Sequence, residues 1–468
     1  METFQEENNK ILEHIMQRYF KSWKEKDNEK YDNFRTLEIM INYDCNLACK
    51  YCYGARYGEC TPKGNEGLYS SKIFGNKENI MKNLHMLLNW IKENKYSPHI
   101  ELFSGEPFYQ KIGFEIVELI IDELSECPPD AFVIPTNFTF LLSNKLTEEV
   151  ERLIAKGKEK NVPMYLSSSF DGKLIEQNRP FKHTVKDLTF DHGIAKWEYK
   201  ENALEDPRDN AYYDRVFAFC KKYEYGFHPM IYSENVNLWK DNFLWFQKMF
   251  KKYDIPFHML YLLEIRNPEW SDAQIKEFGN FVEFLIKWSW DRVGCNLDNY
   301  MDFLFQGKGF NILNSPLGSI GRGLGCGFQS GIYTRLGDLS IVPCHRTCYP
   351  PLNYGYFDVK DNKIIGVRSN NIEFMIASLS ADASTFPYCE QCIISPLCSH
   401  GCLGAQVETT GDPFTPIPTV CKLEHEKIKV MIKTYREIGI LEGIYNKINK
   451  DKSEAFKYME KVINSETK

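Results

Sequence analysis

The spacing of apolar residues along the chain alternates between that of helices and that of strands. Residues at four-residue intervals, Ile11, Ile15, Tyr19 and Trp23, predict an amphipathic helix over residues 10–27. Short apolar runs predict strands at 37–42, 99–103, 132–137, 164–170, 226–232 and 256–263. Helical patterns lie between them, at 81–94, 112–124, 146–157, 214–222 and around 241–253. The chain is thus predicted to be a series of strand and helix units.

Six strands that alternate with helices predict parallel β-α units, in which catalytic loops gather at the carboxyl ends of the strands. Six units rather than eight indicate an open, partial (β/α)6 barrel in an α/β fold. Residues 180–209 break the alternation, because they are polar and have no clear periodicity. We expect an inserted loop there, either a surface excursion or a segment that touches substrate.

Composition narrows the possible functions. The 468 residues are enough for two or three domains, or for one large barrel with an appendage. The net charge of −7 argues against a dominant nucleic-acid surface, which would need a basic excess. The 15 cysteines are about three per cent of the chain, well below the roughly 8% of a disulfide scaffold. Their grouping at CxxC spacing favours metal ligation in a reducing compartment.

The chain is expected to be cytoplasmic. Its first residues, METFQEENNK, have neither the basic start nor the apolar core of a signal peptide. No apolar run approaches the roughly 18 residues that a membrane-spanning helix needs. A protein with cysteine-ligated metal in that compartment should be sensitive to oxygen when purified.

Three cysteines with CxxxCxxC spacing, Cys45, Cys49 and Cys52, follow the first predicted strand. A [4Fe-4S] cluster normally takes four thiolates, so three leave one iron open for a substrate or cofactor. A zinc site is the alternative, but zinc prefers four ligands in short paired knuckles. Cys60 is separated from Cys52 by seven residues, without a matching CxxC. The spacing therefore favours a catalytic cluster.

With the aromatic Tyr51 before its last cysteine, the motif resembles that of the radical S-adenosylmethionine (SAM) enzymes. The resemblance implies a (β/α)6 barrel with the cluster loop after the first strand, and it places Tyr51 beside SAM. It also implies that the open iron chelates SAM, whose reductive cleavage yields methionine and a 5′-deoxyadenosyl radical.

Motifs after the next three strands support the resemblance. Ser104-Gly105-Glu106-Pro107 resembles the GGEP element of the family, with Ser104 in place of the first glycine. Thr136-Asn137 resembles the start of the TNG element, with Phe138 in place of glycine, and Ser169-Phe170-Asp171-Gly172 resembles SxDG. The resemblance implies that SAM is contacted by Gly105, Glu106, Asn137, Ser169 and Arg179. Each polar residue could instead serve only as a turn or helix cap.

A second cysteine group lies near the carboxyl end of the chain. Residues 389–402 have the spacing CxxCxxxxxCxxxC, which resembles a SPASM domain, although Leu339 stands where that domain usually has glycine. The resemblance implies two auxiliary [4Fe-4S] clusters, hence three in all. One would be held by Cys389, Cys392, Cys398 and Cys421. The other would be held by Cys326, Cys344 and Cys402, with either Cys348 or a substrate thiolate as fourth ligand.

The alternative for this second group is a zinc-ribbon-like structural domain. Three further cysteines, Cys127, Cys220 and Cys295, are isolated in the sequence and are expected to be buried, unreactive thiols. The predicted organisation is a helical extension (1–35), a radical SAM barrel (36–265), a helical bridge (266–318), a SPASM domain (319–425) and a helical tail (426–468).

Radical SAM enzymes with this appendage typically modify peptides or proteins. We therefore expect an oxidoreductase that abstracts hydrogen from a ribosomally made peptide and installs a thioether or carbon–carbon crosslink. Formylglycine formation, as in sulfatase maturation, is the alternative reaction, and a non-catalytic redox sensor is the alternative of another class. Only 44 residues precede Cys45, so no leader-binding winged-helix module of roughly 80 residues is expected at that end. The expected partners are a precursor peptide or protein and an electron donor such as flavodoxin or ferredoxin, with no nucleic acid and no membrane.

Overall fold

The computed structural model describes most of the chain. The described residues are 2–25, 34–53, 75–181, 185–191, 194–199, 206–306, 309–317, 331–348, 350–381 and 385–466. The chain forms two compact units. The first comprises Met1–Ser169, Arg179–Tyr225 and Gly327–Ser380, and the second Phe170–Asn178, Gly226–Cys326 and Ala381–Lys468. Each unit is described by itself below.

An eight-stranded sheet is the frame of the first unit, with the strand order β12-β11-β10-β9-β1-β2-β3-β4. Its parallel part comprises β1 (Thr36–Met40), β2 (His99–Phe103), β3 (Ala131–Thr136) and β4 (Met164–Ser168). On the other side of β1 the sheet continues through β9 (Gly331–Arg335), β10 (Ser340–Val342), β11 (Gly355–Lys360) and β12 (Lys363–Ser369). The strand β9 is parallel to β1, and the remaining neighbours are antiparallel.

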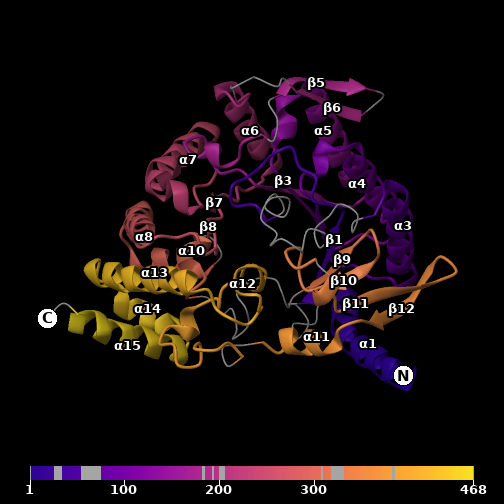
Figure 1. Cartoon of the computed structure of the whole chain (residues 1–468). Helices are drawn as coiled ribbons and strands as arrows, with labels where there is room; N and C mark the ends of the chain where they lie inside the picture. The colour runs from indigo at the N-terminus through magenta and orange to yellow at the C-terminus, as the bar shows by residue number, and fades with distance from the viewer. Residues whose placement is uncertain are drawn as a thin grey trace. The chain divides into compact units, whose positions relative to one another are not determined.

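Helices α3 (Lys77–Asn94), α4 (Lys111–Glu123) and α5 (Asn144–Glu159) lie side by side along the four parallel strands (Figure 1). Two of them begin at side-chain caps, since Asn76 accepts from the Asn79 amide and Ser143 from the Leu146 amide. Their apolar residues form the buried core with the strands. The unit also contains α1 (Glu2–Lys24), α6 (Asn210–Tyr223), α11 (Ile372–Leu379) and short 3-10 turns at Pro107–Tyr109, Thr139–Leu142 and Pro350–Leu352.

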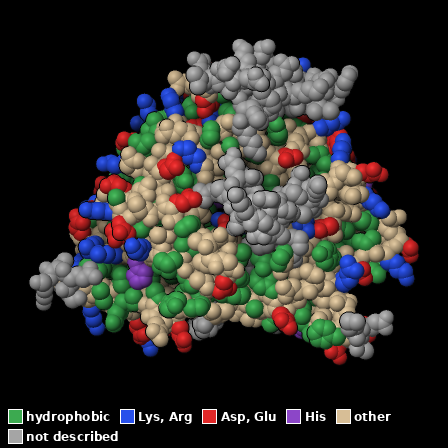
Figure 2. All heavy atoms as spheres, in the orientation of Figure 1, with side chains coloured by type: hydrophobic (Ala, Val, Ile, Leu, Met, Phe, Trp, Pro, Cys, Tyr) green, Lys and Arg blue, Asp and Glu red, His purple; other side chains and the backbone are tan. Residues whose placement is uncertain are grey.

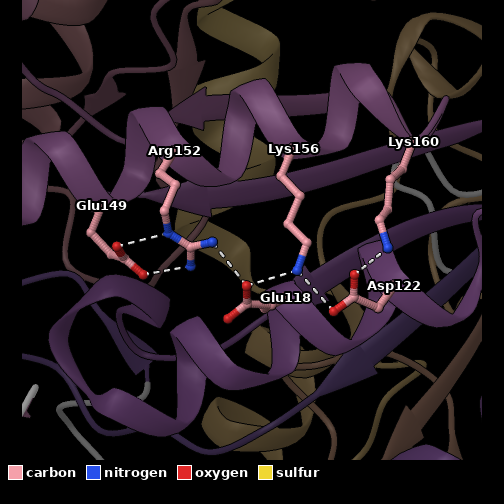
Figure 3. Close-up of polar contacts among 6 residues, drawn as sticks. All are labelled: Glu118, Asp122, Glu149, Arg152, Lys156 and Lys160. Atoms are coloured by element: carbon pink, nitrogen blue, oxygen red, sulfur yellow. Dashed lines mark hydrogen bonds and ion pairs between the residues drawn. The ribbon is translucent and has the colours of Figure 1, made fainter.

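A ladder of ion pairs joins the outer surfaces of α4 and α5 (Figure 3). Lys156 lies between Glu118 and Asp122, 2.8 Å from each, while Arg152 binds Glu118 and Lys160 binds Asp122. Exposed pairs of this kind contribute about 0–1 kcal/mol each. The ladder therefore aligns the two helices more than it stabilises them.

The second unit is mainly helical. Its strands β7 (Met230–Ile231) and β8 (Leu263–Glu264) form a parallel pair. Its helices are α7 (Trp239–Tyr253), α8 (Asp272–Arg292), α9 (Leu297–Phe305), α10 (Asn311–Asn314), α12 (Leu403–Thr410), α13 (Pro418–Glu437), α14 (Leu441–Lys447) and α15 (Lys450–Glu466). Short 3-10 turns lie at Glu176–Asn178, Ser233–Leu238 and Ser395–Leu397. Within this unit the most extensive packing is between α8 and α13, which lie along each other.

The predicted α/β class is confirmed, and the first four predicted strands are present as β1 to β4. The strand predicted at 226–232 is reduced to β7, and the one predicted at 256–263 is wrong, because only its last residue lies in β8. The first helix is also present, but its buried stripe is Leu12, Met16, Tyr19 and Trp23, whereas Ile11 is exposed. The expected loop at 180–209 is wrong in one respect, because it contains the hairpin β5 (Val185–Asp191) and β6 (Ile194–Tyr199). Both strands are rich in the β-branched and aromatic residues that favour strands.

Charge is distributed evenly over the visible described surface. In Figure 2 basic and acidic side chains are interspersed, and on this face the described residues form no field of one sign. None of the helices within the described ranges combines the length and the apolar character that a bilayer span requires.

Candidate functional site

The loop after β2 lies directly on the cysteine loop that follows β1. The Gly105 amide donates to the Asn42 carbonyl at 3.0 Å, and the Glu106 amide donates to the Asp44 carbonyl at 2.9 Å. A Cβ atom on Gly105 would lie 2.3 Å from the Asp44 carbonyl oxygen and 2.4 Å from that of Tyr43. Only glycine permits so close an approach of two backbones. Gly105 therefore has a structural role in holding the cysteine loop.

Ser104, which departs from the family pattern, makes a specific contact in this interface. Its hydroxyl donates to the Asn42 side-chain oxygen at 2.9 Å, and the same oxygen accepts from the Asp44 amide at 3.1 Å. The serine thus adds a side-chain bond between the two loops. The sequence alone did not show that Ser104 makes this hydrogen bond.

Glu106 is buried and links the loops after β2 and β3. Its carboxylate accepts from the Thr136 hydroxyl at 2.7 Å, the Asn137 amide at 2.6 Å and the Phe108 amide at 3.1 Å. Burial raises the pKa of Glu106 to about 7, although these donors and the Arg179 charge act in the opposite direction. A carboxylate has about four acceptor sites. Among the described residues three donors occupy these sites, which leaves one acceptor site.

Asn137 connects this carboxylate to the cysteine loop. Its amide nitrogen donates to the Asn46 side chain at 2.9 Å and reaches the Cys45 sulfur at 3.7 Å. Its oxygen accepts from the Thr139 amide and hydroxyl at 2.9 and 2.6 Å. Asn137 is therefore oriented by Thr139 and directed toward the first cysteine.

Two residues that replace family glycines keep the left-handed backbone that glycine would adopt. Phe138 has φ 60° and Leu339 has φ 57°, and both side chains are buried. Such a conformation costs a non-glycine residue about 1–2 kcal/mol. The Phe138 ring offsets this by packing against Phe140 and Phe219, at centroid distances of 5.6 and 5.9 Å. Both residues therefore adopt the left-handed conformation that glycine favours.

The remaining predicted SAM contacts lie near the same strand ends. The Ser169 amide donates to the Thr136 carbonyl at 2.8 Å. Arg179 is buried, and its charge acts on Glu106. The predicted contact Tyr51 is half-buried in the cysteine loop. The structure thus brings Cys45, Glu106, Asn137, Ser169 and Arg179 to one edge of the sheet, while their roles toward SAM stay predictions.

The three cysteines of the loop lie within electrostatic reach of one another. The pKa of Cys45 is raised, chiefly by burial and further by Cys49, Glu106 and Cys52. Buried thiolates at this place would need a nearby positive charge, which an iron cluster supplies. Across the described ranges, no three Cys, His, Asp or Glu side chains adopt the geometry of a metal site. The ligand assignments stay predictions.

Cys344 and Cys348 lie in the first unit, beside the end of β1. Cys348 is fully buried, its sulfur lies 3.2 Å from the Met40 sulfur, and it donates to the His345 carbonyl at 3.0 Å. Burial raises its pKa to about 12. The thiol is thus packed as an apolar side chain with Met40, Tyr333 and Val342. Cys326 and Cys60 lie outside the described residues.

Two carboxylates, the buried Glu38 and the half-buried Glu101, face each other across β1 and β2. Glu38 is paired with the His345 ring nitrogen Nδ1 at 2.9 Å. Burial, together with the Glu38 charge, raises the pKa of Glu101 from 4.5 to about 7. The sequence analysis did not find this cluster, because each residue comes from a different segment of the chain.

The Glu101→Gln variant should be more stable than the parent protein at pH 8. Because the pKa of Glu101 is raised in the folded state, the free energy of unfolding of the parent protein falls as pH rises from about 4.5 to about 7. Above that range the parent holds a partly buried charge at position 101, and the neutral glutamine of the variant does not. The gain is at most about 3 kcal/mol at 1.36 kcal/mol per pKa unit. Urea unfolding at pH 5 and pH 8 measures it, with the exposed Glu148→Gln as control. Equal gains at the two pH values would contradict the pKa assignment.

A second group of cysteines gathers in the second unit. Cys389, Cys398, Cys402 and Cys421 line one pocket, together with His400 and Glu424. The Cys392 sulfur lies 3.5 Å from the His425 Nε2 atom. Burial and the neighbouring Cys421 and Cys392 raise the pKa of Cys389 to about 11. This set of soft donors fits an iron–sulfur cluster or zinc.

Four charged residues beside this pocket were not predicted, and all but Arg266 are buried. Lys427 lies 3.3 Å from Glu264 and 2.9 Å from Glu424, and Arg266 lies 3.1 Å from Glu264. Burial alone would raise the pKa of Glu264, but the Lys427 and Arg266 charges hold it below its usual value. The one sequence signal was the pair Glu424 and Lys427 within the apolar stripe of the tail helix. We call these four residues the buried charge network.

The isolated cysteines differ from expectation at one position. Cys220 is buried and Cys127 is half-buried, but Cys295 is exposed. Cys295 follows Gly294 just after α8, where both residues have left-handed backbones. The expectation of a buried Cys295 was therefore wrong, because it lies in a surface turn that ends a helix.

No family model matches the chain, and no curated protein matches its sequence. Among solved structures it resembles anSMEcpe, an anaerobic sulfatase-maturating enzyme, with bound AdoMet, at TM-score 0.53 and 17% identity over 90% of this chain and 98% of that chain. The same protein with AdoMet and the Cp18Cys peptide matches at TM-score 0.51 and 17% identity, covering 87% and 99%. SuiB of Streptococcus suis, bound to precursor peptide SuiA, has TM-score 0.41 and 12% identity, covering 83% and 76%.

At these identities the likeness concerns the fold. It agrees with the mixed α/β architecture of the chain. The chain therefore shares the fold of anSMEcpe, which is a radical SAM enzyme of the SPASM type.

Proposed function

We propose that this protein is a radical SAM oxidoreductase that modifies a peptide or protein. The observation that carries the proposal is the packing of Gly105, Glu106 and Asn137 around the Cys45 loop at the carboxyl edge of the parallel strands. A [4Fe-4S] cluster held by Cys45, Cys49 and Cys52 would, with SAM, supply a 5′-deoxyadenosyl radical there. This placement matches the site that parallel β-α folds use for catalysis.

The surrounding residues would bind and orient SAM. The remaining acceptor site of Glu106 suits the ammonium group, since a charge-assisted hydrogen bond to a carboxylate is strong. Arg179, a buried cation beside Glu106, suits the carboxylate of SAM. Asn137 and Ser169 are placed to contact the carboxylate or the ribose, and Tyr51 lies in the cysteine loop itself.

The other cysteines would hold two auxiliary clusters that accept the electron released on product formation. Cys389, Cys392, Cys398 and Cys421 would hold one of them: three of these cysteines line a pocket that Cys402 also lines, and Cys392 is a neighbour of Cys389. Cys326, Cys344 and Cys402 would hold the other cluster. For the fourth ligand of that cluster, Cys348 is a weaker candidate than a substrate thiolate, because its sulfur is packed against Met40.

For the substrate we propose a ribosomally made peptide, with an oxidative crosslink as the product and flavodoxin or ferredoxin as the electron donor. The neighbour anSMEcpe with a bound peptide is consistent with a peptide or protein substrate. The same neighbour is a sulfatase-maturating enzyme, which favours formylglycine formation as a second candidate.

Anaerobic reconstitution tests the proposal. The loaded protein should release 5′-deoxyadenosine from SAM under reduction, whereas the Cys45→Ala/Cys49→Ala/Cys52→Ala variant should release none and keep its auxiliary-cluster absorbance. Cys127→Ala, which removes an isolated thiol, is the matched control. Turnover by the triple variant, or zinc without inorganic sulfide in the parent, would reject the proposal and leave a zinc or sensor protein.

Mass spectrometry separates the two candidate products. A crosslinked peptide loses two hydrogens and gives no reaction with hydroxylamine, whereas a formylglycine product carries an aldehyde and forms an oxime. The substrate to use is any short peptide that a neighbouring gene encodes.

A further inference from the structure

Arg208 makes several side-chain contacts at the base of the inserted hairpin. Its side chain is 1% exposed. The Nε atom donates to both Asp206 carboxylate oxygens, at 2.8 and 3.0 Å, and Nη2 donates to the Arg179 carbonyl at 2.9 Å. Nη2 also pairs with Asp206, and the guanidinium lies 5.0 Å from the Phe181 ring centroid. Arg208 thus joins the two ends of the inserted segment.

Arg208 is itself rigidly held. The next residue, Asp209, caps α6 by accepting from the Tyr212 amide at 2.8 Å. The Asp206 side chain accepts from the Arg208 amide at 2.9 Å. The first turns of α6 are anchored in the core by the buried Tyr212 and Tyr213. The guanidinium is therefore fixed to a packed helix rather than to a free loop.

The residues that Arg208 holds are those that pair with the cysteine loop. The Ala48 amide donates to the Pro180 carbonyl at 2.8 Å, and Leu47 forms an antiparallel bridge with Phe181. Ala48 lies between Cys45 and Cys49 in the sequence. A continuous series of contacts thus runs from α6 through Arg208 and residues 179–181 to the predicted catalytic loop.

We propose that Arg208 is a positioning residue that holds the 179–181 segment against the cysteine loop, and so fixes Cys45 and Cys49 for cluster and SAM binding. The proposal rests on the proposed function for its catalytic consequence. Arginine suits this position because its planar fork binds a carboxylate and a carbonyl together and stacks on an aromatic ring. Lysine would keep the charge but could not make all these contacts.

The mechanical part of the proposal is tested by hydrogen exchange on the metal-free protein. In Arg208→Lys the Ala48 amide should exchange at least tenfold faster, while amides in α3 to α5 keep their rates. Arg215→Lys, on the exposed face of the same helix α6, is the matched control and should change nothing. If Arg208→Lys fails to fold, Phe181→Leu, which removes only the ring under the guanidinium, should give a smaller increase in the same amide. An unchanged Ala48 rate in the folded variants would overturn the proposal.

A spectroscopic measurement tests the catalytic part. In the loaded, reduced protein, the SAM concentration that converts the electron paramagnetic resonance signal of the catalytic cluster should rise at least tenfold in Arg208→Lys, with the auxiliary signals unchanged. Faster Ala48 exchange with an unchanged SAM requirement would overturn the positioning role. A parent protein that shows no response to SAM would reject the proposed function instead, and the Ala48 rate would then decide the mechanical link alone.

Discussion

Replacing Lys427 with methionine is expected to lower the free energy of unfolding by about 3–5 kcal/mol. Lys427 is the cation between Glu264 and Glu424, and all three side chains are only 2% exposed. Removing one member of a buried ion pair leaves an uncompensated charge in a medium that solvates it poorly. Urea unfolding of the anaerobic, loaded protein, followed by tryptophan fluorescence, measures the loss.

The same helix supplies the control. Lys422 pairs with Asp272 at 2.9 Å, but its side chain is 59% exposed, so Lys422→Met should change the stability by no more than about 1 kcal/mol. Adding Glu424→Gln to Lys427→Met should recover part of the loss, because Glu264 keeps its pairing with Arg266 and Glu424 is the carboxylate that the lysine neutralised. Similar losses of stability in the two lysine variants would show that the buried charge network does not contribute the predicted free energy of unfolding.

The Gly105→Ala variant is expected to lose at least about 10²-fold in 5′-deoxyadenosine formation. The new Cβ would lie within 2.4 Å of two carbonyl oxygens of the cysteine loop, so that loop has to move. A displacement of about 1 Å at a reacting centre is enough for a loss of this size. Anaerobic turnover and iron content per chain measure the effect, and iron should be lost only from the catalytic site.

Gly366→Ala is the control for Gly105→Ala. Gly366 lies in β12, and a Cβ there would meet no heavy atom within 4 Å. Its activity and iron content should equal those of the parent protein. Full activity of Gly105→Ala would mean that the loops after β1 and β2 do not need their close approach.

The parts of the fold that local patterns encode were predictable from the sequence. Each barrel strand is a short apolar run, and the CxxxCxxC spacing is local, so both could be read directly. The GGEP-like and TNG-like elements were also found, and the structure accounts for their departures: Ser104 bonds to Asn42, and Phe138 adopts the backbone of the missing glycine.

The parts that depend on distant residues were not predictable in this way. The buried charge network joins the end of β8 to α13, across more than 160 positions. The contact of Arg208 with Arg179 spans the inserted segment, whose composition gave no periodic signal. The pairing of β9 with β1 likewise joins residues almost 300 positions apart, which no hydrophobic period reveals.

This last pairing limits how the chain can be divided. The strand that precedes Cys45, Cys49 and Cys52 has neighbours on both sides, β2 and β9, and β9 comes from the region that carries Cys344. A fragment ending before residue 331 would leave the backbone of β1 unpaired along one side. Such an exposed strand edge can pair with another chain and cause aggregation. The sheet around β1 is therefore completed by residues that the ribosome adds late. The strand before the cysteine loop gains its second neighbour only when most of the polypeptide has been made.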